Sequence, residues 1–203
     1  EPNKIGLIFE GCESTYREWN ERANRVANAF AELGVQPGDR VGLLMMNSPE
    51  FLESFFGLAK MGAIVVPLNW RLAPPEISCI ANDAGISTLV YGSEYTKLVA
   101  AVRGSICAKT YVVAGEEVPA DDYSYAERTA AASAVEPQTV GGGDDPLVIM
   151  FTAGTTGKPK GAVLTHNNLF YDSCTVSFSL DWRKSDRVLV ALPLFHIGAL
   201  IYV

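Results

Sequence analysis

The chain has 203 residues, of which 48% are hydrophobic and 19% are charged, and its formal net charge is −7. This length suffices for one large domain or two small ones with a buried core. The acidic balance argues against a nucleic-acid partner, and no apolar stretch reaches the roughly 20 residues needed to span a bilayer. Four cysteines without a CxxC pair suit free thiols in a reducing compartment. We therefore expect a cytoplasmic protein without an integral membrane segment.

The N-terminal third begins an alternation of helix and strand patterns. Apolar residues recur at spacings of three and four over residues 15–33, which predicts an amphipathic helix. Thr15 and Glu18 have the spacing of a capping box at its start. The continuous apolar run 41–46 predicts a buried strand, and Ser48-Pro49 predicts the start of a second helix.

The same alternation continues to residue 113. We expect strands at 63–68, 86–91 and 109–113, with helices at 75–84 and 95–102 between them. Strands that start at 41, 63, 86 and 109 are separated by 22, 23 and 23 residues, a spacing that fits right-handed βαβ units. The expected fold class is therefore α/β, with a doubly wound, mostly parallel sheet.

Residues 114–145 carry a weaker signal. The Ala-rich segment 125–135 predicts a short helix, and 141–146 is a turn-rich connector. This connector is either a subdomain boundary or a mobile surface loop. The organisation that we expect is a first α/β subdomain over 1–140, followed by a hairpin and the start of the next subdomain over 141–203.

A glycine- and threonine-rich segment follows the expected strand 147–151 and reads Thr152-Ala-Gly-Thr-Thr-Gly-Lys-Pro-Lys-Gly161. Its glycines let the backbone approach a ligand closely, its hydroxyl and N–H groups can donate to phosphate oxygens, and its two lysines add positive charge. A Walker loop requires glycine in place of Thr152 and Ser or Thr in place of Pro159. We therefore expect a strand–loop–strand hairpin to hold the phosphates, and a hairpin turn without a ligand is the alternative.

Four segments resemble motifs of the acyl-adenylate-forming enzymes, which include fatty acyl-CoA synthetases, aryl-CoA ligases and peptide-synthetase adenylation domains. Residues 151–163 resemble the phosphate-binding signature of that family. The other three are Ser14-Thr-Tyr-Arg-Glu-Trp19, Ala59-Lys-Met-Gly-Ala-Ile-Val-Val-Pro-Leu-Asn69 and Leu192-Pro-Leu-Phe-His-Ile-Gly198. Four motifs in order are more specific than one glycine-rich loop. The chain thus resembles the N-terminal part of the large domain of a fatty acyl-CoA synthetase.

This resemblance implies an activity for the full-length protein. With Mg²⁺ and ATP, such enzymes convert a carboxylic acid, here a fatty acid as the leading hypothesis, to an acyl-AMP with release of pyrophosphate. The acyl group then passes to CoA, so that ATP and CoA are both substrates. An aryl-CoA ligase and a non-catalytic nucleotide-binding module are the alternatives. Because the later motifs and the C-terminal domain of the family do not occur in these residues, we expect the 203 residues alone to be inactive.

The resemblance also implies roles for individual residues. Phe195 and His196 match the aromatic–histidine motif, so we expect both to bind the carboxylic acid and His196 to act in catalysis as a positioning and electrostatic group. They follow an expected strand at 187–192, at the carboxyl end where open α/β sheets bind ligands. A packed histidine bonded to a backbone carbonyl is the alternative. Thr152 is the candidate magnesium ligand, and the ATP phosphates are expected on Thr152, Ala153, Gly154, Thr155, Thr156, Gly157, Lys158, Pro159 and Lys160.

Ala153 stands where the family usually has serine, so the chain lacks one hydroxyl donor at this position. A lost neutral hydrogen bond costs about 1 kcal/mol, which corresponds to roughly fivefold weaker binding. In the full-length protein, we expect Ala153→Ser to lower the dissociation constant of Mg-ATP by about that factor. Isothermal titration calorimetry measures this constant, and an unchanged or higher value would contradict the prediction.

Overall fold

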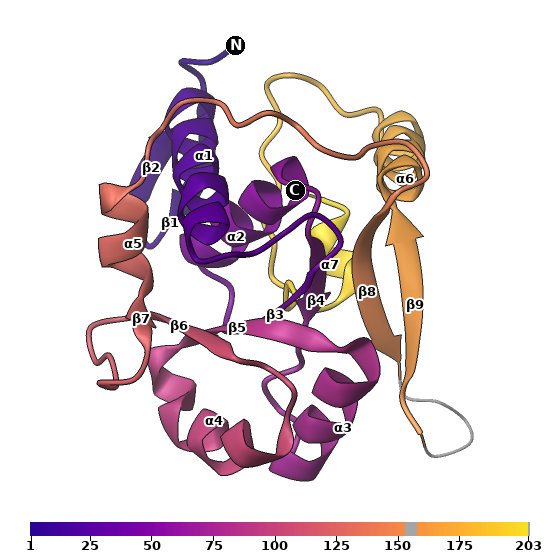
Figure 1. Ribbon diagram of the computed structural model, residues 1–203. Helices are drawn as coiled ribbons and strands as arrows, with labels where there is room; N and C mark the ends of the chain where they lie inside the picture. The colour runs from indigo at the N-terminus through magenta and orange to yellow at the C-terminus, as the bar shows by residue number, and fades with distance from the viewer. Residues whose placement is uncertain (153–157, 203) are drawn as a thin grey trace.

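A seven-stranded, mostly parallel sheet organises the computed structural model, which describes residues 1–152 and 158–202 (Figure 1). The strand order is β7-β6-β5-β3-β4-β8-β9, with parallel pairing from β7 to β8 and an antiparallel β8–β9 pair at one edge. The doubly wound, mostly parallel fold class expected from the sequence is therefore confirmed. The strands are β3 (Arg40–Leu44), β4 (Ile64–Pro67), β5 (Ile86–Gly92), β6 (Thr110–Ala114), β7 (Tyr123–Ser124), β8 (Pro146–Thr152) and β9 (Lys160–Thr165).

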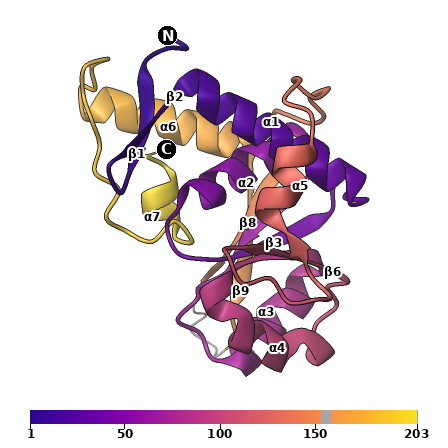
Figure 2. The same ribbon diagram turned by 90° about the vertical axis from the view of Figure 1, so that its left-hand side faces the viewer.

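Helices cover both faces of this sheet. One face carries α1 (Tyr16–Glu32), α2 (Pro49–Lys60) and α5 (Tyr125–Ala131), and the other carries α3 (Pro74–Ala84) and α4 (Thr96–Val102) (Figures 1 and 2). A further helix, α6 (His166–Ser179), follows β9. The β3–β4 connection carries α2 over one face and the β5–β6 connection carries α4 over the other, so the winding reverses between the adjacent strands β3 and β5. None of the described helices combines the length and the apolar character that crossing a bilayer requires.

Local sequence signals account for where the helices start. The Thr15 hydroxyl accepts a hydrogen bond from the Glu18 N–H, and the Glu18 carboxylate accepts one from the Thr15 N–H at 2.7 Å. The capping box predicted for α1 is therefore confirmed. In the same way, the Ser48 hydroxyl accepts from the Phe51 N–H at 3.3 Å and caps α2.

Two segments differ from the sequence-based expectations. An antiparallel hairpin of β1 (Ile5–Phe9) and β2 (Cys12–Thr15) precedes α1 where no strand was predicted, because β2 is mostly polar and shows no apolar alternation. The strand predicted at 187–192 was wrong. Leu189 is 90% exposed, and none of the strands in the described part of the chain pairs with this segment, although a strand needs a neighbour for its backbone groups.

The segment after α5 is held against α1 by side chains. Asn24 and Asn28, one turn apart on α1, donate hydrogen bonds of 2.7 to 3.1 Å to the carbonyls of residues 133–135. Lys60 of α2 forms an ion pair with Glu136, whose carboxylate also accepts from Asn24 at 3.0 Å. Beyond this connector, β8 joins the same sheet as β4, and the division of the chain expected at residue 140 stays a prediction.

A buried carboxylate joins three helices on this face of the sheet. Glu53 of α2 is 7% exposed, accepts a hydrogen bond of 3.1 Å from the Tyr125 hydroxyl of α5, and pairs with Arg22 of α1 at 3.3 Å. Burial raises the pKa of Glu53 above its ordinary value, although the Arg22 guanidinium and the Tyr125 hydroxyl act in the opposite direction. A raised pKa in the folded state favours folding at low pH, and this contribution is lost as the pH rises through that pKa.

We expect Glu53→Gln to abolish this pH dependence because glutamine does not titrate. The free energy of unfolding of the variant minus that of the unaltered chain should therefore increase between about pH 3 and about pH 7. Urea denaturation at each pH measures this difference. Glu136→Gln is the matched control. Its difference should decrease over the same range, because the hydrogen bonds from Lys60 and Asn20 lower the pKa of Glu136 to about 2, and a constant difference for Glu53→Gln would contradict the prediction.

Candidate functional site

The carboxyl ends of the parallel strands lie at one edge of the sheet. Because β3, β4, β5, β6 and β8 run in the same direction, the loops that follow Leu44, Pro67, Gly92, Ala114 and Thr152 all emerge there. Open α/β sheets bind ligands at this edge, near the point where the winding reverses. Of the described residues predicted to form the site, Thr152 ends β8 at this edge, and Phe195 packs against Trp70, which follows β4.

The glycine-rich segment connects two antiparallel strands, as the sequence predicted. In the β8–β9 pair, Thr152 lies opposite Lys160 and Phe151 lies opposite Gly161. A Cβ atom added to Gly161 would lie 3.0 Å from the Phe151 ring and 2.9 Å from Ile149 Cγ2. Glycine at this position therefore leaves free the space that the side chains of Ile149 and Phe151 occupy.

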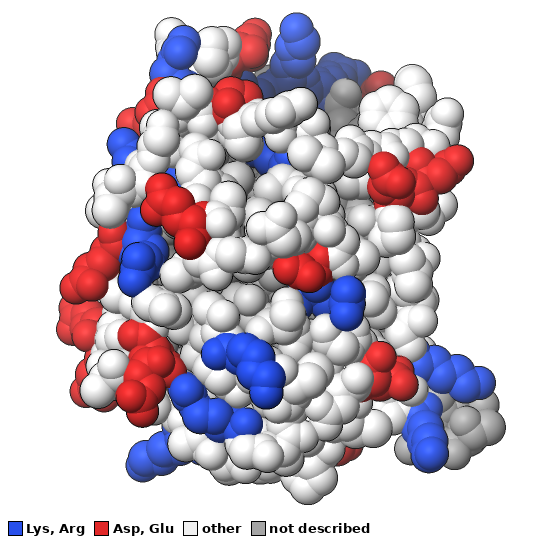
Figure 3. All heavy atoms as spheres, viewed as in Figure 1, with Lys and Arg blue, Asp and Glu red and all other residues white. Residues whose placement is uncertain are grey.

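Four of the nine residues expected to hold ATP lie within the described part of the chain, namely Thr152, Lys158, Pro159 and Lys160. The side chains of Thr152 and both lysines are exposed. Figure 3 shows basic side chains at this end of the hairpin. The other five residues lie outside the described residues, so their role stays a prediction: Ala153, Gly154, Thr155, Thr156 and Gly157.

Thr152 is the candidate ligand for magnesium. It offers one neutral hydroxyl oxygen at the end of β8. In residues 1–152 and 158–202, no group of three or more His, Cys, Asp and Glu side chains is arranged to hold a metal ion. Mg²⁺ usually keeps several waters and is bound through substrate phosphates together with one or two protein oxygens. A magnesium ion that is bound with the nucleotide would thus need only one or two oxygens from the protein, which the Thr152 hydroxyl could supply, and its role as a metal ligand stays a prediction.

Phe195 lies beside Trp70, which follows β4, although among the described residues no strand leads directly into residues 195 and 196. The Phe195 ring packs edge-on against Trp70, with 6.1 Å between centroids and an interplanar angle of 84°, and Trp70 lies 6.3 Å from the Tyr95 ring. His196 is exposed and precedes the short helix α7 (Ile197–Leu200), where its Nδ1 accepts a hydrogen bond of 3.1 Å from the Gly198 N–H. With Nδ1 as an acceptor, Nε2 is the ring nitrogen that can carry the hydrogen and donate it.

Sequence reasoning missed three residues at this edge, namely Asn47, Trp70 and Tyr95. Asn47 follows β3 and bonds to the backbone on both sides of Pro193. Trp70 follows β4, and Tyr95 ends a 3₁₀ turn after β5. All three are polar or aromatic residues just beyond a buried parallel strand, and this position is the signal that could have identified them.

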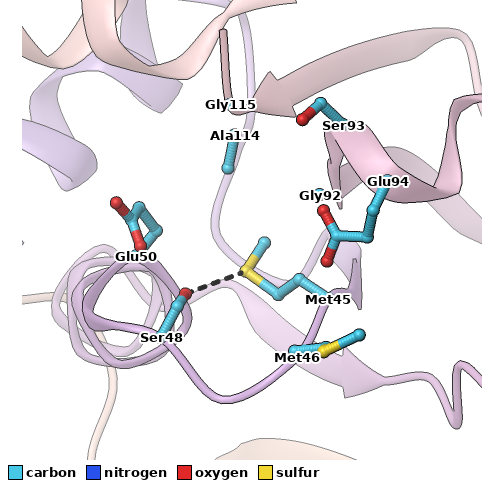
Figure 4. A pocket seen from close by; sticks show the side chains of 9 residues that line it. All are labelled: Met45, Met46, Ser48, Glu50, Gly92, Ser93, Glu94, Ala114 and Gly115. Atoms are coloured by element: carbon cyan, nitrogen blue, oxygen red, sulfur yellow. Dashed lines mark hydrogen bonds between the residues drawn. The ribbon is translucent and has the colours of Figure 1, made fainter. Parts of the chain in front are cut away.

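A cavity of about 250 Å³ lies where the winding reverses between β3 and β5 (Figure 4). The carboxylates of Glu50 and Glu94 stand on opposite sides of it, with the thioether of Met45 between them. Its described lining contains neither lysine nor arginine. Acidic walls repel phosphate groups, so the electrostatics favour the basic end of the β8–β9 hairpin over this cavity as the phosphate site.

The sequence matches the AMP-binding enzyme family over residues 1–203. It is 44% identical to the long-chain-fatty-acid–CoA ligase FadD13 of Mycobacterium tuberculosis, over 92% of this chain and 36% of that protein. It is 39% identical to a feruloyl-CoA synthase of Amycolatopsis sp., over 98% of this chain and 38% of that protein. It is 38% identical to a crotonobetaine/carnitine–CoA ligase of Salmonella typhimurium, over 96% of this chain and 40% of that protein.

Solved structures share this fold. A Mycobacterium tuberculosis fatty acyl CoA synthetase superposes with a TM-score of 0.86 at 39% identity, over 94% of this chain and 37% of that one. An anthranilate CoA ligase, AuaEII, in complex with anthranoyl-AMP superposes with a TM-score of 0.89 at 32% identity, over 96% of this chain and 38% of that one. The chain thus spans 36% to 40% of the curated relatives. Because the family match extends from the first residue to the last, the chain belongs to the AMP-binding enzyme family.

Proposed function

We propose that the full-length protein activates a carboxylic acid with ATP and transfers the acyl group to CoA. In the first step, a carboxylate oxygen attacks the α-phosphorus and pyrophosphate leaves, which produces an acyl-AMP. In the second step, the CoA thiolate attacks the acyl carbonyl and AMP leaves. The observation that carries the proposal is the exposed basic hairpin at the carboxyl edge of the sheet, in a chain that matches the AMP-binding enzyme family throughout.

In this proposal, the described residues at the end of the hairpin bind the ATP phosphates. Negative charge on the β- and γ-phosphates must be neutralised while the carboxylate approaches the α-phosphorus. Lys158 and Lys160 supply positive charge on the β9 side of the hairpin end, and Thr152 at the end of β8 lies opposite Lys160. A magnesium ion that is bound with the nucleotide would add further positive charge at the same phosphates.

In the same proposal, Phe195 and His196 bind and orient the carboxylic acid. His196 donates a hydrogen bond from Nε2 to the carboxylate and so orients the attacking oxygen. Its Nδ1 already accepts from the Gly198 N–H, which supports a positioning and electrostatic role and argues against a general base. The Phe195 ring, supported by Trp70, provides an apolar surface beside the carboxylate.

A fatty acid is the proposed substrate, with an aryl acid as the alternative. The 44% identity to a long-chain-fatty-acid–CoA ligase supports the fatty acid, and the 39% identity to a feruloyl-CoA synthase supports the aryl acid. Ala199 and Leu200, in the apolar run after His196, are buried in the core, so this run gives no support to either acid. The proposed cytoplasmic location is supported by the four cysteines, all of which are free thiols.

Carboxylate-dependent ATP–pyrophosphate exchange tests the proposal in the full-length protein with fatty, aryl and amino acids. We expect exchange with fatty acids and a loss of about 10- to 100-fold in Lys160→Ala, because hydrogen bonds to charged groups contribute about 1.5–3 kcal/mol. Lys109→Ala is the matched control. Lys109 is an exposed lysine before β6, at the opposite edge of the sheet, and its loss should leave exchange unchanged.

The other outcomes separate the alternatives. Exchange with aryl or amino acids only would retain the adenylation chemistry and overturn the fatty-acid substrate. ATP binding without exchange for any acid would support the non-catalytic nucleotide-binding module. Equal exchange in Lys160→Ala and the unaltered protein would remove the hairpin as the phosphate site.

A further inference from the structure

Asn47 ties the segment that carries Phe195 and His196 to the end of β3. Its side-chain amide donates a hydrogen bond of 2.9 Å to the Leu192 carbonyl, and its side-chain oxygen accepts one of 2.8 Å from the Leu194 N–H. These two residues flank Pro193, which has no N–H of its own. One side chain therefore fixes the backbone on both sides of the proline.

The same backbone continues directly into the turn that presents His196. The His196 N–H donates to the Pro193 carbonyl at 3.0 Å, and the His196 carbonyl accepts from the N–H groups of Ala199 and Leu200 at 3.0 and 3.3 Å. From Leu192 to α7 the chain is thus a continuous hydrogen-bonded path. This path links residues 192–194 to the residue that carries the imidazole.

The other contacts of this segment are apolar. Leu194 is 4% exposed within the core, and Phe195 packs edge-on against Trp70. Apolar packing is not directional, whereas a pair of hydrogen bonds constrains both position and rotation. Within residues 1–152 and 158–202, the Asn47 amide makes the side-chain hydrogen bonds that hold residues 192–194 to the sheet.

Asn47 is itself held between two ordered elements. Leu44, the last residue of β3, is completely buried, and Ser48 caps α2 through the Phe51 N–H. The Asn47 side chain therefore starts from a backbone that is fixed on both sides. A positioning group needs such support if it is to hold another residue within a fraction of an ångström.

We propose that Asn47 is a positioning residue for the carboxylic acid, acting through Leu192 and Leu194 to hold Phe195 and His196 at the carboxyl edge. This inference rests on the proposed function, in which His196 donates to the carboxylate. Asn47 touches neither the acid nor the nucleotide. Loss of the Asn47 side chain should therefore weaken binding of the carboxylic acid and leave binding of ATP at the hairpin unchanged.

Asn47→Asp in the full-length protein tests this role. Aspartate has the same shape and still accepts from the Leu194 N–H, but its second oxygen repels the Leu192 carbonyl instead of donating to it. In ATP–pyrophosphate exchange, we expect the KM of the acid to rise about fivefold, the factor that corresponds to the loss of one ordinary hydrogen bond. The KM of ATP should stay unchanged.

Asn28→Asp is the matched control. Asn28 also donates its amide to two backbone carbonyls, those of Ser133 and Val135 at 2.7 and 3.0 Å, but it lies on α1 away from the predicted site residues. This variant should lower the melting temperature and leave the KM of the acid unchanged. Asn47→Ala removes both hydrogen bonds without adding a charge and serves as a second variant. It should raise the same KM and accelerate hydrogen exchange at the Leu194 amide.

Three results would overturn the inference. An unchanged KM of the acid in both Asn47 variants would remove the positioning role while leaving the proposed function intact. Parallel increases in both KM values, together with a lower melting temperature, would show a purely structural role. Absence of exchange with any acid in the unaltered protein would overturn both proposals, and the Leu194 amide would then report only on the hydrogen bonds themselves.

Discussion

Parallel pairing of the central strands is the constraint on which the rest of the structure depends. Parallel neighbours cannot be joined by a tight turn, so each pair requires a crossover, and here helices cover both faces of the sheet. The same pairing brings the carboxyl ends of six strands to one edge. Asn47, Trp70 and Thr152 are distant in the sequence. They lie at this edge because each is at, or just beyond, the carboxyl end of a parallel strand. The candidate site is thus a consequence of strand direction before any side chain contributes to it.

The electrostatics of this edge are not uniform, although the chain as a whole carries a net charge of −7. Near the winding reversal, Glu50 and Glu94 make the cavity acidic, whereas Lys158 and Lys160 make the end of the β8–β9 hairpin basic. Polyphosphate is repelled by the first region and attracted by the second. An acidic protein can therefore bind an anionic nucleotide, because the local sign of the charge decides where the phosphates bind.

Much of the fold could be predicted because its signals are local. The capping residues Thr15 and Ser48 identify helix starts within four residues, and the apolar run at 41–46 identifies a buried strand. The segment 187–192 has a similar apolar composition, but strand formation requires a neighbour, and local composition contains no information about one. The contact between Asn47 and Leu192 joins residues 145 positions apart. Such a contact depends on how the strands are arranged in space. Motifs in the sequence could therefore indicate Phe195 and His196, but they could not indicate Asn47, which bonds to the backbone just before them.

The similar relatives are named for different acids, which helps to separate shared chemistry from substrate selectivity in the proposed function. Identity to a fatty-acid, a feruloyl and a crotonobetaine/carnitine ligase differs only between 38% and 44%, so this part of the chain is similarly related to all three. The groups described here address chemistry that such acids share: lysines for phosphates, and an Nε2–H donor with its support for a carboxylate. Ala199 and Leu200 pack into the core instead of facing a substrate. In the proposed function, these groups would therefore act alike on each of these acids, and contacts to the remainder of the acid would determine selectivity.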